Sequence, residues 1–387
     1  MQLGILGGGQ LGRMLALAGA PLGVRTAFFD PMADACAGQV GPLTVADWRD
    51  DRAVRRFAES CDVVTYEFEN VPAETLAAAG DAVRVSPAPS VLAVSSDRLE
   101  EKRAFERIGL SVPPYAPIAP GQAIDAALAI SGRPAMLKSR RGGYDGKGQW
   151  VIDSADDVER GLAELNRPCL LEARVPFTAE ISIAVARGRN GQIVAWGPSR
   201  NEHAEGILSV TRGPWPDGRI ATVESGHLGL EASVIGAAIA GVSALAEDIA
   251  YVGVLAVEFF VVDGTLLANE MAARVHNSFH WTMDFAATGQ FEQHVRAVCG
   301  WPLGDASAIR PSAMVNLVGQ TLGPADLPAG ADHRLHLYGK PPRPGRKVGH
   351  LNLAANDGPA LEHSLSQAMA AVAAAGAEAR GQPQPLG

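Results

Sequence analysis

The sequence predicts an α/β fold that becomes α+β in its second half, built from three domains. In the first hundred residues, short apolar strands alternate with helical stretches, which is the pattern of a parallel sheet wound with helices. After Pro176 the strands are longer and alternate in polarity, as strands of antiparallel sheets do. A chain of 387 residues, with 47% apolar and 19% charged residues, is long enough for two or three hydrophobic cores.

The N-terminal domain, residues 1–100, is expected to be Rossmann-like. Its first helix is predicted at Gln10 to Ala20, because apolar residues recur there at helical spacing. Its predicted strands lie near 2–6, 25–29, 63–66 and 83–85.

A helix at Asp97–Ile108 is expected to lead into a proline-rich linker at Pro113 to Pro120. The small second domain, residues 101–175, has a predicted helix near 121–131 and strands at 135–138, 149–152 and 169–172. The C-terminal domain, residues 176–387, has predicted strands at 180–187, 192–197, 254–262 and 265–270. Its predicted helices lie at about 231–249 and 359–379, before a proline-rich tail.

The net charge of −9 argues against a general nucleic-acid binder, because neutralising a phosphate backbone needs an excess of Lys and Arg. No apolar run approaches the roughly 20 residues that span a bilayer, and no basic signal region precedes the first strand. We therefore expect a cytoplasmic protein without membrane contact.

The four cysteines lie far apart, which argues against a zinc knuckle or a disulfide framework.

Residues 7–12, Gly-Gly-Gly-Gln-Leu-Gly, give the pattern GxGxxG between a predicted strand and a predicted helix, and Asp30 ends the second strand. These features are typical of a dinucleotide-binding loop, since glycines let backbone amides approach an anion at a helix N-terminus. The loop fits a mononucleotide or a ribose phosphate equally well, and it also fits a purely structural tight turn. All three interpretations stay open on this motif.

The segment from Lys138 to Gln149 places four glycines and four basic residues between two predicted strands. Amides and ammonium groups of such a loop can fold over phosphates. The segment is not a Walker A loop, which needs GxxxxGK[ST] before a helix. The alternative is a solvated, flexible hairpin.

Glu258 lies within an apolar strand, and Glu270 follows on the next strand after the turn Asp263-Gly264. A turn of three residues would place the two carboxylates opposite each other, whereas a turn of two would place them on opposite faces. A facing pair repels unless a cation lies between, and oxygen ligands suit Mg²⁺ with nucleotide phosphates. The alternative is one exposed and one salt-bridged Glu.

Polar side chains also follow two strand ends. Glu67 and Glu69 close the third strand, at the edge where open parallel sheets bind ligands. Arg274 to Ser278 follows the strand of Glu270. Taken singly, the two acids also fit helix caps or surface residues, and His276 also fits a structural histidine.

In their order and spacing these segments resemble 5-(carboxyamino)imidazole ribonucleotide synthase, an ATP-grasp ligase family of purine biosynthesis. The likeness runs from Leu3 to about Leu353. It implies an ATP-grasp fold with an N-terminal Rossmann-like parallel-sheet domain, a small lid domain and a C-terminal antiparallel-sheet domain, and it implies a homodimer. Its most specific stretches are residues 7–14, 66–71, 142–149, 276–278 with 280–282, and 343–352.

The resemblance also implies the ligands: ATP with Mg²⁺, which Mn²⁺ can replace, and the small-molecule substrates bicarbonate and aminoimidazole ribonucleotide. The implied metal ligands are Glu258 and Glu270, and the implied catalytic residues are Lys138, Glu69, His276 and Arg274. The implied ATP contacts are Arg98, Lys138, Gly143, Tyr144, Asp145, Gly146, Lys147, Gly148, Gln149, Glu172, Ala173, Arg174, Val175, Glu180, His203, Asn269 and Glu270. The implied ribonucleotide contacts are Gly8, Gly9, Gln10, Leu11, Glu69, Tyr144, Lys147, His276, Asn277, Ser278, Lys340, Arg346 and Lys347.

In the implied reaction, bicarbonate attacks the γ-phosphate of ATP to give carboxyphosphate, and the ribonucleotide amine then captures the carboxyl group. Ala273 and Phe279 stand where the family pattern has Pro and Gly, and Phe cannot cheaply adopt a Gly-only backbone conformation. We therefore expect the loop around His276 to lie differently. The rival interpretations are a sister ATP-grasp ligase that activates formate or another carboxylate, an NAD-dependent oxidoreductase, and a catalytically silent nucleotide-binding regulator.

Overall fold

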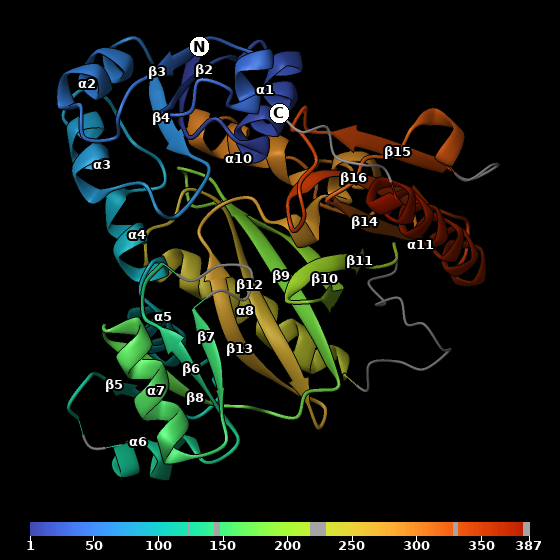
Figure 1. Ribbon diagram of the computed structural model, residues 1–387. Helices are drawn as coiled ribbons and strands as arrows, with labels where there is room; N and C mark the ends of the chain where they lie inside the picture. Colours follow the sequence, from blue (N-terminus) through green and yellow to red (C-terminus); the bar gives the residue numbers. More distant parts are fainter. Residues whose placement is uncertain (123, 143–147, 217–229, 328–331, 382–387) are drawn as a thin grey trace.

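The structure, a computed structural model, describes residues 1–122, 124–142, 148–216, 230–327 and 332–381. The described chain forms three β-sheets. The N-terminal sheet lies at the top of Figure 1 and the small sheet at the bottom, with the large sheet running between and beside them. The predicted combination of a parallel N-terminal sheet with antiparallel sheets is confirmed.

The N-terminal sheet is parallel and has the order β3-β2-β1-β4. The predictions at 2–6, 25–29 and 63–66 are confirmed, but the strand expected at 83–85 is reduced to one bridge between Val64 and Val85. The unpredicted β3 completes the sheet. The strands are β1 (Gln2–Leu6), β2 (Arg25–Asp30), β3 (Leu43–Val45) and β4 (Val63–Tyr66), and the helices are α1 (Gln10–Gly19), α2 (Asp51–Glu59), α3 (Ala73–Gly80) and α4 (Pro89–Ser95).

Helix α5 (Arg98–Arg107) leads from this part of the chain to the small sheet, which is antiparallel in the order β5-β8-β6-β7. The predicted proline-rich linker is wrong in part, because Tyr115–Ile118 form the edge strand β5 against β8. An edge strand tolerates Pro117, since one side of its backbone needs no ladder partner. The other elements are α6 (Ile124–Ser131), β6 (Ala135–Ser139), β7 (Gln149–Ile152), α7 (Ala155–Leu165) and β8 (Cys169–Ala173).

The large sheet is antiparallel, with the order β13-β12-β9-β10-β11-β14-β16-β15. The predictions for its first half are confirmed, whereas β11, helix α10 and the strands from β14 onward were not predicted. The strands are β9 (Ala179–Arg187), β10 (Ile193–Ala204), β11 (Ile207–Arg212), β12 (Gly253–Val262), β13 (Thr265–Ala272), β14 (Ser312–Val318), β15 (Asp332–Leu337) and β16 (Lys347–Ala354). The helices are α8 (Ala232–Asp248), α9 (Thr282–Phe285), α10 (Gln290–Cys299) and α11 (Gly358–Gly381).

The hairpin of β12 and β13 turns differently from the prediction but reaches the predicted result. Val262 pairs with Thr265, so the turn has two residues, and both Asp263 and Gly264 have positive φ. A two-residue turn alone would put Glu270 on the wrong face. A β-bulge corrects this, because Phe259 pairs with Ala268 while Glu258 pairs with Glu270.

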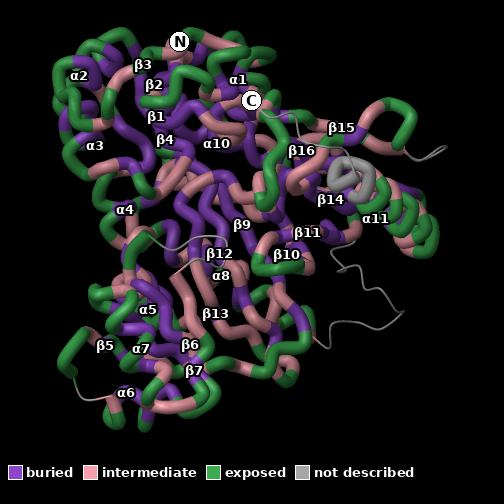
Figure 2. The backbone as a smooth tube through the Cα atoms, viewed as in Figure 1, coloured by how far each residue is buried: buried purple, intermediate pink, exposed green. Residues whose placement is uncertain are grey.

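Helix α10 packs against both α1 and the large sheet, so the N-terminal part and the large sheet share one hydrophobic core. This core joins Leu3 and Met14 to Val254 and Val295. Figure 2 shows the buried segments continuing from β1 and β4 through α10 into β9 and β12. Among the described residues, no helix combines the length and apolarity needed to cross a membrane.

Candidate functional site

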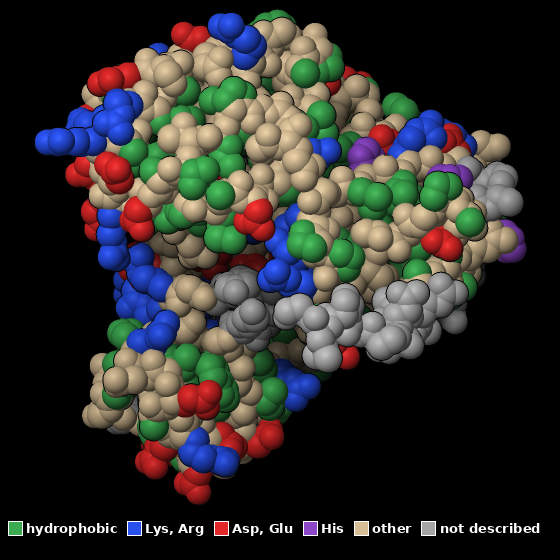
Figure 3. Space-filling model, turned by 45° about the horizontal axis from the view of Figure 1, so that its top comes forward, with side chains coloured by type: hydrophobic (Ala, Val, Ile, Leu, Met, Phe, Trp, Pro, Cys, Tyr) green, Lys and Arg blue, Asp and Glu red, His purple; other side chains and the backbone are tan. Residues whose placement is uncertain are grey.

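A cavity of about 930 Å³ is lined by residues of the small sheet and the large sheet, by helices α1 and α5, and by residues 67–70, which follow β4. Figure 3 shows the molecule hollowed between its upper and lower parts, with Lys and Arg side chains along the hollow. The predicted site residues that line this cavity are Gln10, Leu11, Glu69, Arg98, Lys138, Gln149, Glu172, Ala173, Arg174, Val175, Glu180, His203, Glu258, Asn269, Glu270, Arg274, His276, Asn277, Lys340, Arg346 and Lys347.

Some predicted site residues do not line the cavity. Gly8, Gly9, Gly148 and Ser278 are absent from its wall. The predicted contacts Gly143, Tyr144, Asp145, Gly146 and Lys147 lie outside the described residues. The structure therefore brings together most of the predicted set but leaves the tip of the glycine-rich segment as a prediction.

Glu258 and Glu270 face each other at one end of the cavity. Burial, together with the nearby Glu270, raises the pKa of Glu258 to about 8. Burial would also raise the pKa of Glu270, but the Arg98 guanidinium and Lys138 outweigh burial and lower it. Arg98 donates to Glu270 at 3.0 Å. The pair therefore holds one ionised carboxylate and one whose ionisation needs further positive charge.

These carboxylates fit a hard divalent cation, because such a charge between them would offset their repulsion. Within the part of the chain that the structure describes, no group of three or more His, Cys, Asp or Glu is placed to hold a metal. A cation at Glu258 and Glu270 would thus complete its coordination with oxygens of a ligand and water, which is the usual arrangement of Mg²⁺ with nucleotides.

Lys138 enters the cavity from β6. Its Nζ donates to Glu172 at 2.5 Å and to the side-chain oxygen of Asn269 at 3.3 Å. Burial would raise the pKa of Glu172, but Lys102 and Lys138 lower it to about 2. The carboxylate is therefore ionised and holds the Lys138 ammonium between the small sheet and the large sheet.

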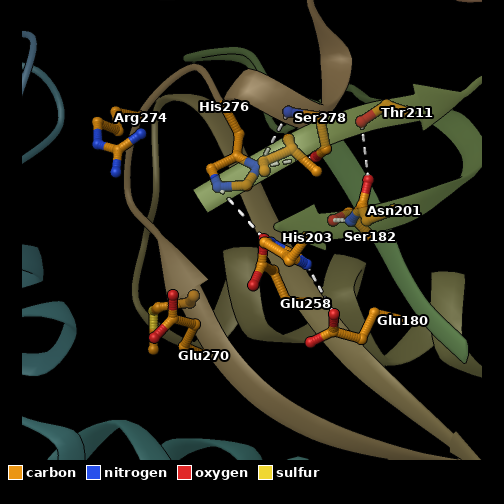
Figure 4. Close-up of polar contacts among 12 residues, drawn as sticks. Glu180, Ser182, Asn201, His203, Thr211, Glu258, Glu270, Arg274, His276 and Ser278 are labelled. Carbon is orange, nitrogen blue, oxygen red and sulfur yellow. Dashed lines mark hydrogen bonds and ion pairs between the residues drawn. The ribbon is translucent and has the colours of Figure 1, made fainter. Parts of the chain in front are cut away.

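Two histidines lie on the Glu258 side of the acid pair, as Figure 4 shows. His276 points its Nε2 toward Glu258 at 3.5 Å, and its Nδ1 lies 2.7 Å from the Ser278 hydroxyl. Burial, with the nearby Arg274 charge, holds the pKa of His276 well below its usual value, so the ring is neutral near pH 7. His203 contacts Glu180 at 2.7 Å. Burial opposes protonation of His203, but the bond to Glu180 outweighs it and raises the pKa.

Arg274 donates to Glu69 at 2.8 Å and so joins the large sheet to the end of β4. Burial would lower the pKa of Arg274, but Glu69 outweighs it. The loop that follows contains Phe279, which stands where the family pattern has Gly. Phe279 ends a short 3-10 helix (Asn277–Phe279), is fully buried, and is not among the described non-glycine residues with positive φ. Phe279 therefore adopts an ordinary backbone conformation, and the expectation that this loop lies differently from the family pattern stays a prediction.

The glycine loop before α1 is occupied by the protein's own carboxylates. Gly8 N–H donates to Asp30 at 2.8 Å, and the N–H groups of Gly9 and Gly12 donate to Glu67 at 2.5 and 2.6 Å. A dinucleotide pyrophosphate would need these same amides. Beside the loop, Lys340 donates to Gln10 at 2.6 Å, which leaves a cationic group and a helix N-terminus at the second end of the cavity.

Comparison with known proteins matches residues 1–96 to the ribonucleotide synthetase preATP-grasp domain, residues 103–291 to the ATP-grasp domain, and residues 312–364 to the phosphoribosylaminoimidazole carboxylase C-terminal domain. The N5-carboxyaminoimidazole ribonucleotide synthase of Pseudomonas aeruginosa is 44% identical over 97% of this chain and all of its own length. The chain belongs to the N5-carboxyaminoimidazole ribonucleotide synthase family. The resemblance indicated by the sequence motifs is thereby confirmed.

Other members of this family agree. The Bacillus subtilis N5-carboxyaminoimidazole ribonucleotide synthase is 39% identical over 90% of both chains. The crystal structure of the Thermus thermophilus synthetase superposes with a TM-score of 0.86 at 43% identity, covering 94% of this chain and 97% of that one. The Staphylococcus aureus synthetase complexed with ADP superposes with a TM-score of 0.83 at 30% identity, covering 96% of each. The protein is thus an ATP-grasp ligase of purine biosynthesis, and an NAD-dependent oxidoreductase is the wrong interpretation.

Sequence reasoning missed two charged residues of this site. Glu101 and Lys102 of α5 are buried beneath the acid pair. Glu67, by contrast, was expected at the ligand-binding edge of the sheet; it lines the cavity and accepts from the glycine loop. A signal was present in α5: Arg98, Glu101, Lys102 and Phe105 recur at helical spacing, so charged and aromatic residues share one face. A charged helix is usually solvated, which is why this face was not recognised.

Proposed function

We propose that the protein carboxylates 5-aminoimidazole ribonucleotide with bicarbonate, consuming ATP and giving 5-carboxyaminoimidazole ribonucleotide, ADP and phosphate through carboxyphosphate. The observation that carries this proposal is the two-ended cavity. One end has Arg98, Lys138 and the acid pair, which suits the triphosphate of ATP, and the other has Gln10 and Lys340, which suits a ribose phosphate.

In this proposal, Lys138 and Arg98 stabilise the charge that develops as a bicarbonate oxygen attacks the γ-phosphate. Glu258 and Glu270 hold Mg²⁺, for which Mn²⁺ can substitute, and the bound cation neutralises phosphate charge. Glu180 and His203 bind the nucleotide beside the acid pair. Carboxyphosphate is sensitive to water, so we expect the segment 143–149 to cover the site before the chemistry begins.

The second step needs a group that accepts the amine proton of the ribonucleotide. His276 is neutral and lines the cavity, and Glu69 lines it beside Arg274. Both remain candidates for this role. Replacing each in turn separates them, since loss of the base blocks carboxyl transfer while bicarbonate-dependent ATP cleavage continues.

One assay tests the reaction: release of phosphate from ATP with bicarbonate, with and without aminoimidazole ribonucleotide. We expect the ribonucleotide to increase turnover, and we expect formate not to replace bicarbonate. If formate supports turnover and bicarbonate does not, a sister ligase is the correct interpretation. Two further predictions accompany this one: a homodimer, which light scattering tests, and a cytoplasmic location, which cell fractionation tests.

A further inference from the structure

Lys102 is not among the residues that line the cavity. It nevertheless contacts three groups that shape the end of the cavity proposed to bind the triphosphate of ATP. Its side chain is 1% exposed. Its Nζ donates to the backbone carbonyl oxygens of Ala268 at 3.2 Å and of Asn269 at 2.9 Å. It also forms an ion pair with Glu172 at 2.7 Å.

The two carbonyls belong to the β-bulge of β13, in which Asn269 is the extra residue. The extra residue of a bulge is left out of the regular ladder, and a buried carbonyl needs another hydrogen-bond donor. Lys102 supplies that donor. This bulge places Glu270 opposite Glu258. Lys102 therefore holds the stretch of backbone that determines the relative position of the two carboxylates.

Glu172 links Lys102 to Lys138. One carboxylate oxygen of Glu172 lies against Lys102 and the other accepts from Lys138 at 2.5 Å. Lys138 also reaches the side chain of Asn269 at 3.3 Å. Removing Lys102 would leave a buried carboxylate with a single cationic partner, which would draw Lys138 more tightly to Glu172 and away from a phosphate.

Two further residues of α5 form hydrogen bonds with β13. Arg98 donates to the Glu270 carboxylate, and Glu101 accepts from the backbone N–H of Met271 at 2.5 Å. Three side chains on one face of α5 therefore contact four consecutive residues of β13, 268–271. Lys102 is the member of this face that contacts both the bulge and Glu172.

We propose that Lys102 is a positioning residue: it fixes the Asn269 bulge and Glu172 together, so that Glu270 and Lys138 point into the same end of the cavity. This inference rests on the proposed role of Glu258 and Glu270 as metal ligands. It assigns Lys102 an effect on metal and ATP, and none on the ribonucleotide, whose predicted contacts Gln10 and Lys340 do not touch it.

The test uses Lys102→Met, which removes the charge but keeps an unbranched side chain of similar length. The matched control is Arg103→Met on the exposed face of α5. Binding of Mn²⁺ in the presence of ADP, measured by electron paramagnetic resonance, is expected to weaken about 10- to 100-fold in Lys102→Met and to stay at the wild-type value in the control. The kcat is expected to fall, while the KM for the ribonucleotide stays unchanged.

A folded Lys102→Met protein with wild-type Mn²⁺ affinity and turnover overturns the proposal. If that variant does not fold, Lys102→Arg, which keeps the charge but moves the nitrogen, is measured instead. Weakened Mn²⁺ binding at an unchanged melting temperature supports positioning, and wild-type binding overturns it. Failure of both variants to fold also overturns it, in favour of a purely structural role. Turnover of the wild-type protein with ATP, bicarbonate and the ribonucleotide is measured first. A failure of the proposed reaction is thereby distinguished from a failure of the role proposed for Lys102.

Discussion

Glu258 lies opposite Glu270 because β13 contains one residue more than the regular ladder requires. The two-residue turn would otherwise pair Glu258 with Asn269 and direct Glu270 to the other face. The bulge therefore converts an ordinary hairpin into a pair of facing carboxylates, and it does so at an edge strand, where an extra residue disturbs only one ladder.

The first prediction concerns this pair. Glu270→Gln is expected to lower kcat with Mg-ATP by about 10²- to 10³-fold, the usual cost of removing one preorganised electrostatic contact. Phosphate release measures this loss. The control is Glu292→Gln, whose surface pair with Arg296 is worth about 0.3–0.5 kcal/mol. An unchanged melting temperature shows that the fold persists, and full activity of Glu270→Gln would remove it from the metal site.

The second prediction concerns Asp97, which caps α5 and binds Arg140 and Arg141 at the start of the glycine-rich segment. Its buried carboxylate accepts from Arg140 at 2.7 and 2.9 Å and from Arg141 at 3.2 Å. Asp97→Asn is expected to cost about 1.5–3 kcal/mol of stability, since these hydrogen bonds are charge-assisted. It is also expected to raise the KM for ATP more than the KM for the ribonucleotide.

Urea unfolding and steady-state kinetics check this prediction. Asp81→Asn, which breaks an exposed pair with Arg55, serves as the control because both side chains of this pair are solvated. Equal rises of both KM values in Asp97→Asn would show that the contact stabilises the fold generally and does not anchor the segment.

The sequence could predict those site residues whose charge stands out within a strand or loop that the local pattern already predicts. Lys138, Glu258 and Glu270 lie in strands whose periodicity is readable. The proposed role of the two glutamates follows from charge in an apolar strand, whereas that of Lys138 follows from the family resemblance. The register of Glu258 and Glu270 could not be derived, because the sequence does not reveal which residue a strand will bulge out.

The glycine loop shows a different limit of sequence reasoning. Its pattern indicated anion binding, and anions do occupy it, but they are Asp30 and Glu67 of the same chain. Glu67 lies 55 residues from Gly12. Contacts over such separations depend on how β1, β2 and β4 align, which no local pattern records. Similarly, β14 and β16 were missed because their polar and apolar residues are both buried against neighbours.

A third prediction concerns the ribonucleotide end of the cavity. Lys340 is largely buried, and burial lowers its pKa, but its bond to Gln10 keeps the ammonium beside the first turn of α1. Lys340→Met is expected to raise the KM for aminoimidazole ribonucleotide at least about 10-fold, the loss of one charge-assisted bond to phosphate. The KM for ATP should stay constant. The control is Arg334→Met on exposed β15, and a parallel rise in the KM for ATP would contradict the assignment.

A fourth prediction concerns pH, through His294, a buried residue that bridges the N-terminal sheet and the large sheet. Its Nδ1 accepts from the Val254 N–H at 3.1 Å, so its Nε2 carries the proton and donates to Thr65 at 2.9 Å. Burial lowers the pKa of His294 from 6.5 to about 4. The unfolded chain therefore binds a proton at a higher pH than the folded chain. Stability is fully present above pH 6.5 and is lost as pH falls toward 4, by about 3 kcal/mol in all.

Unfolding in urea at pH 7.5, 5.5 and 4.5 measures this loss, with His294→Gln as the comparison. Other buried histidines, such as His280 and His350, also have a lowered pKa and contribute to the acid sensitivity of both proteins. The difference between the wild type and His294→Gln isolates the contribution of His294, because glutamine does not titrate. The wild type is expected to lose more free energy of unfolding between pH 7.5 and 4.5 than the variant. Equal losses would show that the bridge between Thr65 and Val254 does not depend on a neutral imidazole.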